Sequence, residues 1–435
     1  MKRLVCILTA CALLAAGFTG CGNKGSQSSS AASAGQTTTG TTEINFYGGW
    51  TGADLEKMKG LVSDFNASQT AVKVNFTSQQ WTNMFTKFLA DYQANSTPDV
   101  VAMHTFEMGQ FVKMGVLDSN AIKSMNLKES DYVKTAWDGC LSDGVLYGVP
   151  LDINMHALYY NKDLFKSAGI DKAPATKDEL IADAQKLTVD TSGKNSTESG
   201  FNAKSVKQYG FGFLQNHHTF YQIYALMNQQ GYNPFTSDMT KITLDKTKTA
   251  NAIQFFEDLA YKYKVVPIGE KSPIDDFKAG TVAMVVDGNW QLSGMNTVTF
   301  NWDTAVYPQI FEKKAVWGAS ELLALPKNSN STKQKAAQTF VKWLSDNSAK
   351  WALSGQIPAN IAAQKAATNL KGINAYKAEL DYVTFLPAHP KATKIFSSAA
   401  PSPILTAAQS ALLNNRDAGG IVTQLETDIN KVLAS

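Results

Sequence analysis

The side chains able to catalyse a reaction do not form a recognisable catalytic motif. The sequence has no nucleophile elbow, no phosphate loop, no metalloprotease helix and no paired cysteines at zinc-ligand spacing. The Gly-Phe-Gly run at 210–212 lacks the third glycine of a dinucleotide fingerprint, and the adjacent His217 and His218 would point in different directions on a helix. We therefore predict no catalytic residue, metal site or cofactor. A carboxylate pair of the glycosidase type stays open, because only its spacing in three dimensions defines it.

A second set of side chains has the composition of a binding site. Tryptophans stand at or just beyond the ends of predicted strands: Trp50, Trp81, Trp290 and Trp317. Polar residues occupy comparable places: Gln80, His104, Glu107, Asp152, Asn154, Asp287, Ser320 and Glu321. Aromatic surfaces with a few polar groups around them are typical of a pocket for a small ligand, and loops after strands commonly carry such residues.

The elements that position these residues alternate between strand and helix. A strand is predicted at 43–50 and a helix at 51–68, with Thr51 as its cap and apolar residues at helical spacing. A strand at 72–76, a helix at 81–96 and a continuous apolar strand at 98–104 follow. This βαβαβ order predicts a parallel sheet flanked by helices, and such sheets bind ligands beyond the carboxyl ends of their strands.

The rest of the chain repeats this alternation after Pro150. Thr176 and Glu179 have the spacing of a capping box. Further elements are predicted at 157–165, 175–187, 209–214, 251–264, 281–288, 321–326, 334–346 and around 421–432. The folded part, from Glu43 to Ser435, exceeds the length over which one core keeps growing, so two lobes are expected. His156, Tyr160, Asn161, Trp343 and Trp351 are interpreted as packing or turn residues, and Trp137 and Trp302 are left unassigned.

The N-terminus has the pattern of an export signal. Lys2 and Arg3 precede an apolar run from Leu4 to Phe18 that is short for a membrane span. Gly20 and Cys21 then resemble a bacterial lipobox, with Phe18 as a departure from it, and a plain secretory signal is the alternative. Residues 1–20 are predicted as the signal peptide, and 21–42 as a lipidated cysteine with a flexible tether.

Charge and cysteine content narrow the class of protein. The formal net charge is +3, and the sequence has no basic stripe, so a nucleic-acid role has no support. Cys6 and Cys11 would leave with the signal and Cys21 would carry lipid. Cys140 alone would remain, so the mature chain would have no internal disulfide, and Cys140 is predicted to be a buried small side chain.

Several segments in order resemble the family 1 extracellular solute-binding proteins of ABC importers, the group that includes maltose-binding protein. They cover nearly the whole mature chain: "YGVP" (147–150), "ALYYNKDLF" (157–165), "PATKDELIADAQKLT" (174–188), "FKAGTVAMVVDGNW" (277–290), "WGASELLALPKNS" (317–329), "AAQTFVKWLS" (336–345) and "GQIPAN" (355–360). The resemblance implies a two-lobed α/β fold of the type II periplasmic-binding-protein kind, each lobe a mainly parallel sheet flanked by helices. Expected extents are 43–151 with 320–386 for the N-terminal lobe and 152–319 with 387–435 for the C-terminal lobe.

The resemblance also implies a function and partners. The chain would be a monomeric lipoprotein that captures an oligosaccharide between its lobes and delivers it to the permease subunits of an ABC importer. Its lipid anchor would hold it on the extracellular face of a Gram-positive cell membrane, or in the periplasm of a Gram-negative bacterium. The alternatives are a cell-surface glycan-degrading enzyme and a ligand sensor for a membrane kinase.

The resemblance assigns roles to the candidate residues. The stretch from Pro150 to Asn154 would be a crossing between the lobes, with Asp152 and Asn154 on the cleft floor. Trp290 would stack on a sugar ring, and His217 or His218 would bond a sugar hydroxyl. Further hinge segments would run through 316–320 and 385–390. The full set of predicted ligand-binding residues is Trp50, Gln80, Trp81, His104, Glu107, Asp152, Asn154, His217, Asp287, Trp290, Trp317 and Ser320.

Overall fold

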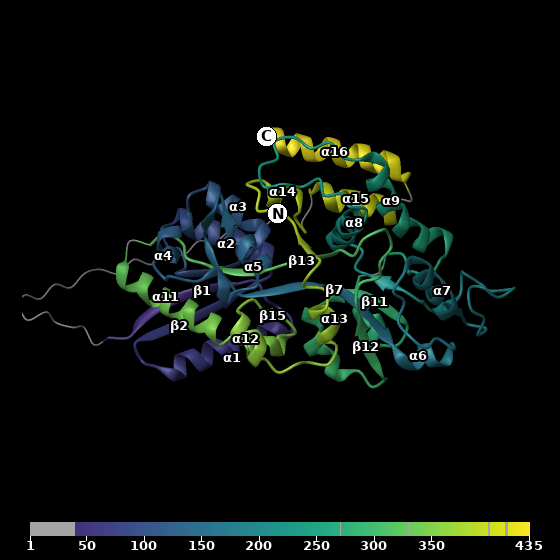
Figure 1. Ribbon diagram of the computed structural model, residues 1–435, viewed down its shortest axis with the longest axis horizontal. Coiled ribbons are helices and arrows are strands. Elements are labelled where there is room, and N and C mark those ends of the chain that lie inside the picture. The colour runs from purple at the N-terminus through teal and green to yellow at the C-terminus, as the bar shows by residue number, and fades with distance from the viewer. Residues whose placement is uncertain (1–39, 270, 329, 399–400, 414–415) are drawn as a thin grey trace, which may run out of the picture. The chain divides into compact units, whose positions relative to one another are not determined.

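Two β-sheets organise the part of the chain that the computed structural model describes (Figure 1). The described residues are 40–435, except 270, 329, 399–400 and 414–415. The predicted signal peptide, the lipidated Cys21 and the tether as far as residue 39 lie outside this range. Strand β1 begins at Thr42, one residue before the predicted start of the folded part. Within the described residues, no helix is long and apolar enough to cross a membrane.

The first sheet contains the predicted βαβαβ unit. Its order is β2 (Val72–Ser78), β1 (Thr42–Gly48), β3 (Val100–His104), β14 (Glu321–Ala324), β6 (Gly148–Pro150). β1 pairs in parallel with both β2 and β3, as the sequence predicted. β14 pairs antiparallel with β3 and with β6, so it runs against the other four strands.

The second sheet is built around one long strand, β7 (Asp152–Asn161). β7 pairs antiparallel with four strands, while β10 and β16 extend the sheet at its two ends in parallel pairs with β11 and β13. The other strands are β10 (Gly212–Phe213), β11 (Met284–Gly288), β12 (Trp302–Ala305), β13 (Val316–Ala319), β15 (Ile357–Pro358) and β16 (Val383–Phe385). β7 is therefore the reversed strand of this sheet, as β14 is of the first.

The chain crosses between the sheets at the two reversed strands. β6 ends at Pro150 and β7 begins at Asp152, while β13 ends at Ala319 and β14 begins at Glu321. The two crossings lie side by side, because Ala319 pairs with Asn154 and the Leu151 N–H donates to the Glu321 carbonyl oxygen at 2.8 Å. In each sheet all strands except the reversed one run in the same direction, and the predicted two-lobed α/β fold is confirmed. The extents of the lobes stay a prediction.

Helices cover both faces of the first sheet (Figure 1). α1 (Ala53–Ser68) and α11 (Ser331–Asp346) contact β2 and β1, and α2 (Trp81–Gln93) and α3 (Thr105–Lys113) contact β1 and β3. The residues of β3 alternate between two apolar clusters: Val100 and Ala102 belong to one, Val101 and Met103 to the other. A strand buried on both faces explains the continuous apolar run from which it was predicted.

The last two helices of the chain pack on helices of the second sheet. α15 (Pro403–Leu412) and α16 (Ala418–Ala434) contact α8 (His217–Gln229) and α9 (Lys246–Glu257) (Figure 1).

The remaining helices are α4 (Ser119–Lys123), α5 (Lys134–Gly139), α6 (Lys162–Ser167), α7 (Lys177–Leu187), α10 (Pro273–Lys278), α12 (Ile361–Ala366), α13 (Ile373–Lys377) and α14 (Ala392–Ile395). Short strands are β4 (Leu141–Ser142), β5 (Val145–Leu146), β8 (Val189–Asp190) and β9 (Val206–Gln208). The 3₁₀ or π segments are Glu129–Asp131, Asp258–Lys262, Asn289–Thr297 and Trp351–Ser354.

The structure confirms some of the predictions about helix N-termini and contradicts one of them. The capping box of Thr176 and Glu179 is confirmed at the start of α7, and Asn161 caps α6. The predicted cap at Thr51 is wrong: α1 begins after Gly52, and the Asp54 carboxylate accepts the Gly52 and Leu55 N–H groups instead. An acid in the first turn satisfies those donors better than a hydroxyl two residues before the helix, and it also suits the positive end of the helix dipole.

Packing predictions for single residues are confirmed where burial tests them. Cys140 and Trp351 are fully buried, and His156 is 1% exposed. Trp343 packs against Phe65 at a centroid distance of 5.4 Å. The unassigned Trp137 and Trp302 are buried as well.

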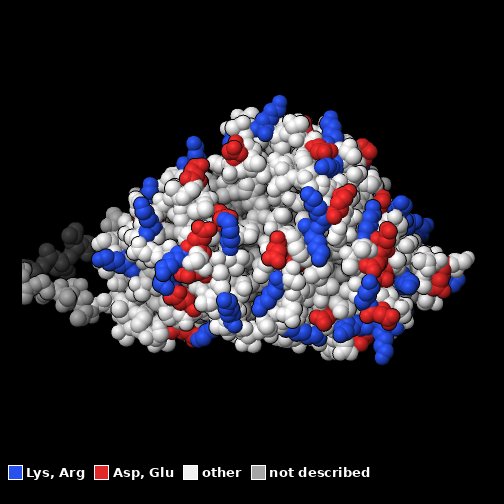
Figure 2. Space-filling view, viewed as in Figure 1, with Lys and Arg blue, Asp and Glu red and all other residues white. Residues whose placement is uncertain are grey.

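On the face drawn in Figure 2, Lys and Arg side chains are interspersed with Asp and Glu, as the small net charge led us to expect.

Candidate functional site

A cavity of about 720 Å³ opens where the turns after β1, β2 and β3 face residues of the second sheet. The carboxyl ends of these parallel strands meet at one edge, which is where α/β sheets bind their ligands. Lining residues from the first sheet come from 49–54, 80–89 and 104–111. Those from the second side come from Asn154 of β7, the start of α8, the turn after β11, Trp317 of β13 and the segment 393–398.

Trp81 and Trp50 form the aromatic wall on the side of the first sheet. Their ring centroids lie 5.5 Å apart with an interplanar angle of 74°, and Trp81 also lies 4.3 Å from the ring of His104. The Trp81 ring covers Gly49: a Cβ at that position would come within 1.9 Å of the ring. The glycine before Trp50 is thus required by the close approach of an aromatic ring from the next turn.

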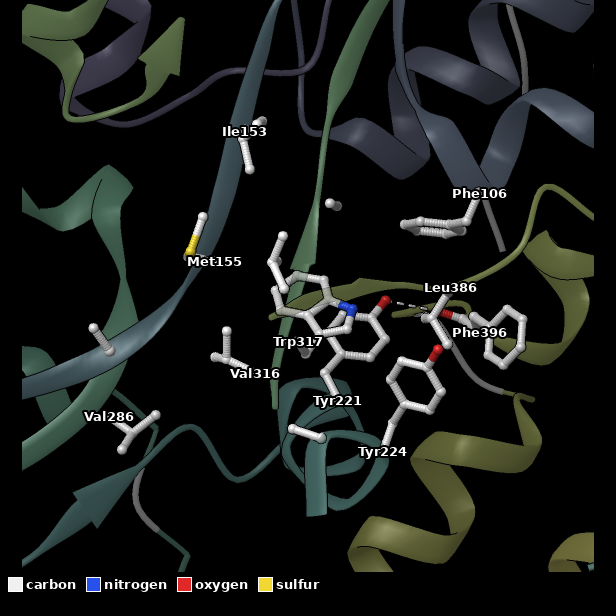
Figure 3. Close-up of a cluster of buried hydrophobic side chains, with 14 of the residues drawn as sticks. Phe106, Ile153, Met155, Tyr221, Tyr224, Val286, Val316, Trp317, Leu386 and Phe396 are labelled. Carbon is white, nitrogen blue, oxygen red and sulfur yellow. Dashed lines mark hydrogen bonds between the residues drawn. The ribbon is translucent and has the colours of Figure 1, made fainter. Parts of the chain in front are cut away.

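The opposite wall contains Trp290, Trp317, Tyr221 and His218. Trp290 is the second residue of the 3₁₀ segment Asn289–Thr297, which directly follows β11, and its ring covers Gly288, where a Cβ would come within 2.1 Å of it. Trp317 lies flat against Tyr221 (Figure 3). His218 lies between these groups, with centroids 5.6 Å from Trp290 and 5.5 Å from Trp317.

Polar side chains also line the cavity. They are Asp54, Gln80, His104, Glu107, Asn154, His217, Lys278, Gln291, Glu321 and Gln356. Glu107 Oε2 accepts the His104 N–H at 3.3 Å and lies 2.9 Å from His104 Nδ1, so these two residues orient each other at the start of α3. The cavity is therefore lined both by aromatic side chains and by polar side chains that can form hydrogen bonds.

Three histidines on this side, His156, His217 and His218, are neutral hydrogen-bonding groups. Burial lowers the pKa of His156 to about 3 and that of His217 to about 4, and it lowers the pKa of His218 well below its usual value. His156 Nε2 and His218 Nδ1 lie 3.0 Å apart, so one ring donates to the other. Across the described ranges, no group of three or more His, Cys, Asp or Glu residues is placed to hold a metal ion.

Most of the predicted ligand-binding residues meet at this cavity. Its lining includes Trp50, Gln80, Trp81, His104, Glu107, Asn154, His217, Trp290 and Trp317. The lining as described does not include Asp152, Asp287 and Ser320, each of which is fully buried. Ligand contact by the predicted residues stays a prediction.

The three residues outside the lining bond to the protein itself. Asp152 accepts the Trp351 indole N–H at 2.5 Å and the Glu321 backbone N–H at 3.0 Å. Asp287 accepts the Gly288 N–H at 2.7 Å, and the Ser320 hydroxyl donates to the Glu321 carbonyl oxygen at 3.2 Å. These side chains support the crossing strands and the turn that carries Trp290, because buried polar groups need internal partners.

Sequence reasoning missed several lining residues. They are Asp54, Phe106, Tyr221, Lys278, Gln291, Gln356, Thr393, Phe396, Ser397 and Ser398. Tyr221 had a usable signal, since it stands four residues after His217 and shares its helix face. The segment at 393–398 had none, because only the packing of α14 against α3 brings it to the cavity.

Comparison with known proteins shows which family this chain resembles. A sequence model of the bacterial extracellular solute-binding proteins matches residues 49–351. Maltodextrin-binding protein MdxE of Bacillus subtilis is 26% identical over 385 residues, which cover 83% of this chain and 84% of that protein. A putative binding protein of Brucella abortus is 31% identical over 141 residues, and the chain spans only 34% of its length.

Solved structures agree on the fold. An ABC substrate-binding protein of Listeria monocytogenes in complex with cycloalternan has a TM-score of 0.76 to this chain at 22% identity. The match covers 91% of this chain and 99% of the Listeria chain. Similarity of this extent at low identity shows that both chains share the two-lobed architecture.

Proposed function

The chain belongs to the bacterial extracellular solute-binding protein family, and we propose that it captures an oligosaccharide in the cavity and delivers it to an ABC importer. The observation that carries this proposal is that the partly exposed rings of Trp81 and Trp290 line the cavity on its two sides, backed by the almost fully buried Trp50 on one side and Trp317 and Tyr221 on the other. Sugar rings present flat C–H faces, which pack on aromatic rings. A cavity walled in this way fits a ligand that is apolar on its faces and polar at its edges.

The polar groups and the size of the cavity support a neutral sugar. Sugar hydroxyls both donate and accept, and the amides of Gln80, Asn154 and Gln291 do the same. The volume of about 720 Å³ lies within the roughly 300–1,000 Å³ of small-ligand sites. The ligands named for the relatives, maltodextrin and cycloalternan, support a sugar oligomer.

The lipobox-like sequence supports attachment to the membrane through Cys21. The lipid would hold the protein on the extracellular face of a Gram-positive cell membrane, as a monomer beside the permease. Expression of the full chain and of Cys21→Ala, followed by membrane fractionation, tests this. The parent is expected in the membrane fraction and the variant in the medium, and membrane retention of the variant would contradict the assignment.

A thermal-shift screen tests the ligand class. Malto-, xylo-, galacto- and fructo-oligosaccharides are added to the protein, and the bound sugar should raise the melting temperature because it binds only the folded state. Trp343→Ala is the matched control: Trp343 lies outside the cavity lining, so its truncation should lower stability but keep the ligand-induced shift. Stabilisation by another solute class, with no response to any sugar, would overturn the sugar assignment.

Two outcomes would favour the alternative functions. Release of shorter products when the protein is incubated with glycans, followed by chromatography, would favour a glycan-degrading enzyme. Recovery of a membrane kinase rather than permease subunits in a pull-down with the lipidated protein would favour a ligand sensor.

A further inference from the structure

Glu321 occupies the floor of the cavity at the second crossing between the sheets. It is the first residue of β14, it is 3% exposed, and it belongs to the cavity lining. Its Oε1 atom lies 3.9 Å from Nε2 of His104, another lining residue, so this oxygen is on the cavity side. Its Oε2 atom is buried, and no N–H or O–H of the described residues donates to it.

Asp152, the neighbouring carboxyl, has an N–H donor on each of its oxygens, although burial raises its pKa too. Its Oδ1 accepts the Glu321 backbone N–H at 3.0 Å, and its Oδ2 accepts the Trp351 indole N–H at 2.5 Å. Two N–H donors, one on each oxygen, favour the ionised form of a carboxyl group. Both donors are fixed by the fold, one in the backbone of β14 and the other on the fully buried Trp351.

Of the groups that face Glu321, the indole N–H of Trp50 favours its ionised form, but burial and the neighbouring carboxyls outweigh this contribution. Asp152 of β7 and Asp54 at the start of α1 add negative charge near it. His104 of β3 is the nearby base, but its Nδ1 is turned to Glu107 at 2.9 Å and its Nε2 is too far from Oε1 for a hydrogen bond. Burial, and then the charge of Asp152, raises the pKa of Glu321 well above its usual value.

We propose that Glu321 is a ligand-recognition residue that acts as a neutral carboxylic acid, with its proton held against Asp152 and its Oε1 accepting a sugar hydroxyl. This assignment rests on the proposed function for its ligand, but the position of the proton does not. The same arrangement gives the buried Oε2 a role, since a protonated Oε2 becomes the donor to a carboxylate that can accept it. The floor of the cavity then carries one negative charge, on Asp152, behind a neutral acceptor.

Two substitutions separate a neutral acid from a charged one. In Glu321→Gln the amide N–H replaces the acid proton and the amide oxygen replaces Oε1, so sugar affinity should stay within about threefold of the parent. In Glu321→Leu both are lost, and affinity should fall by about tenfold or more, the usual cost of an unpaired hydrogen-bonding group. Calorimetric titration with the sugar found in the thermal-shift screen measures both.

The control is another buried carboxyl. Glu257 is 5% exposed and has an oxygen without a donor among the described residues, but it lies outside the cavity lining. Glu257→Gln should leave sugar affinity unchanged. If Glu321→Gln loses as much affinity as Glu321→Leu, recognition needs an ionised carboxylate and the proposal is overturned; parent-like affinity of Glu321→Leu would overturn it too.

Infrared spectroscopy of the ligand-free protein locates the proton without any sugar. A protonated carboxyl has a carbonyl absorption that an ionised carboxylate lacks, so the parent minus Glu321→Gln difference spectrum at neutral pH should contain this band. Its absence would overturn the neutral-acid assignment even if the protein binds sugar. Its presence in a protein that binds no sugar would leave the proton in place and reject only the proposed function, so the two failures are distinguishable.

Discussion

The indole ring of Trp317 lies flat on the phenol ring of Tyr221, with centroids 4.3 Å apart and an interplanar angle of 16°. Trp317 belongs to β13 and Tyr221 to α8, and the Tyr221 hydroxyl donates to the Phe396 carbonyl oxygen at 3.0 Å (Figure 3). Both rings are almost fully buried although they line the cavity. The back of the second wall is therefore set by core packing, and Trp290, which is only half-buried, presents more of its ring to a ligand.

Truncation of Trp317 should act mainly on stability. Trp317 is 4% exposed and stacks on Tyr221, so Trp317→Ala leaves a large cavity in the core. We expect the free energy of unfolding to fall by about 3–5 kcal/mol, the usual range for large aromatic truncations. Urea unfolding followed by circular dichroism measures it, and a loss below about 1 kcal/mol would show that the stack contributes little.

Truncation of Trp290 should act mainly on binding. Trp290→Ala removes an exposed ring face while most of the core stays packed, so we expect sugar binding to weaken by about 1–3 kcal/mol with the protein still folded. Calorimetric titration of the folded variant with the sugar measures the affinity. Parent-like affinity, or a failure to fold, would show that Trp290 is a core residue and does not stack on the ligand.

A methyl group at Gly288 should displace the Trp290 ring. The backbone at Gly288 has a φ of −87°, which other residues adopt freely, so Gly288→Ala tests the ring contact without backbone strain. We expect sugar affinity to fall by about tenfold, an effect of the size of one lost stacking contact. In the Trp290→Ala background the same substitution should change the sugar affinity little. If Gly288→Ala lowered the affinity equally with and without Trp290, the contact between the Trp290 ring and Gly288 would be contradicted.

The buried carboxyl of Asp287 should make stability depend on pH. Burial raises the pKa of Asp287 to about 7, above the value of an unfolded chain. Stability from this group is therefore fully present below the unfolded pKa and is lost as the pH rises to about 7. Asp287→Asn should remove that loss, worth up to about 4 kcal/mol at 1.4 kcal/mol per pKa unit. Urea unfolding of parent and variant between pH 4 and 7 measures this difference in stability. If the stability of the two proteins changed with pH in the same way, the raised pKa of Asp287 would be contradicted.

Asp190 provides a control in which the pH dependence of stability has the opposite sign. Hydrogen bonds from Ser192 and Asn202 lower the pKa of Asp190 to about 2. Its contribution to stability is present above the unfolded pKa and is lost as the pH falls toward 2. Asp190→Asn should therefore destabilise the protein most at neutral pH and least in acid.

Ligand binding should close the lobes about the crossing segments. We predicted hinges at 150–154, 316–320 and 385–390; the first contains the start of β7, and the second comprises β13 and the residue that joins it to β14. A sugar that contacts both aromatic walls gains contacts in the closed form, and only that differential affinity can shift the equilibrium. Small-angle scattering should show a smaller radius of gyration at saturating sugar, whereas an unchanged profile would contradict closure.

Local sequence patterns predicted the scaffold of the site well. The βαβαβ unit at 42–104 follows from apolar periodicity, which reports how each element is buried. Tryptophans beyond strand ends pointed to the cavity because parallel strands share one carboxyl edge, and Trp50, Trp81 and Trp290 line it in this way; Trp317 also lines it, but from within β13, near the start of the strand. These inferences needed only the order of the elements and the type of residue at each end.

What the sequence determined by itself is thus the alternation of elements, the two-lobed fold and the strand ends at which a ligand site must lie. The tertiary structure decided which polar side chains reach the cavity. Asp152 and Asn154 stand two residues apart on β7, yet Asn154 lines the cavity while Asp152 bonds to Trp351, 199 residues further along the chain. A hydrogen-bond partner so distant leaves no local pattern, because the partner's position depends on how the two sheets and their crossings pack together.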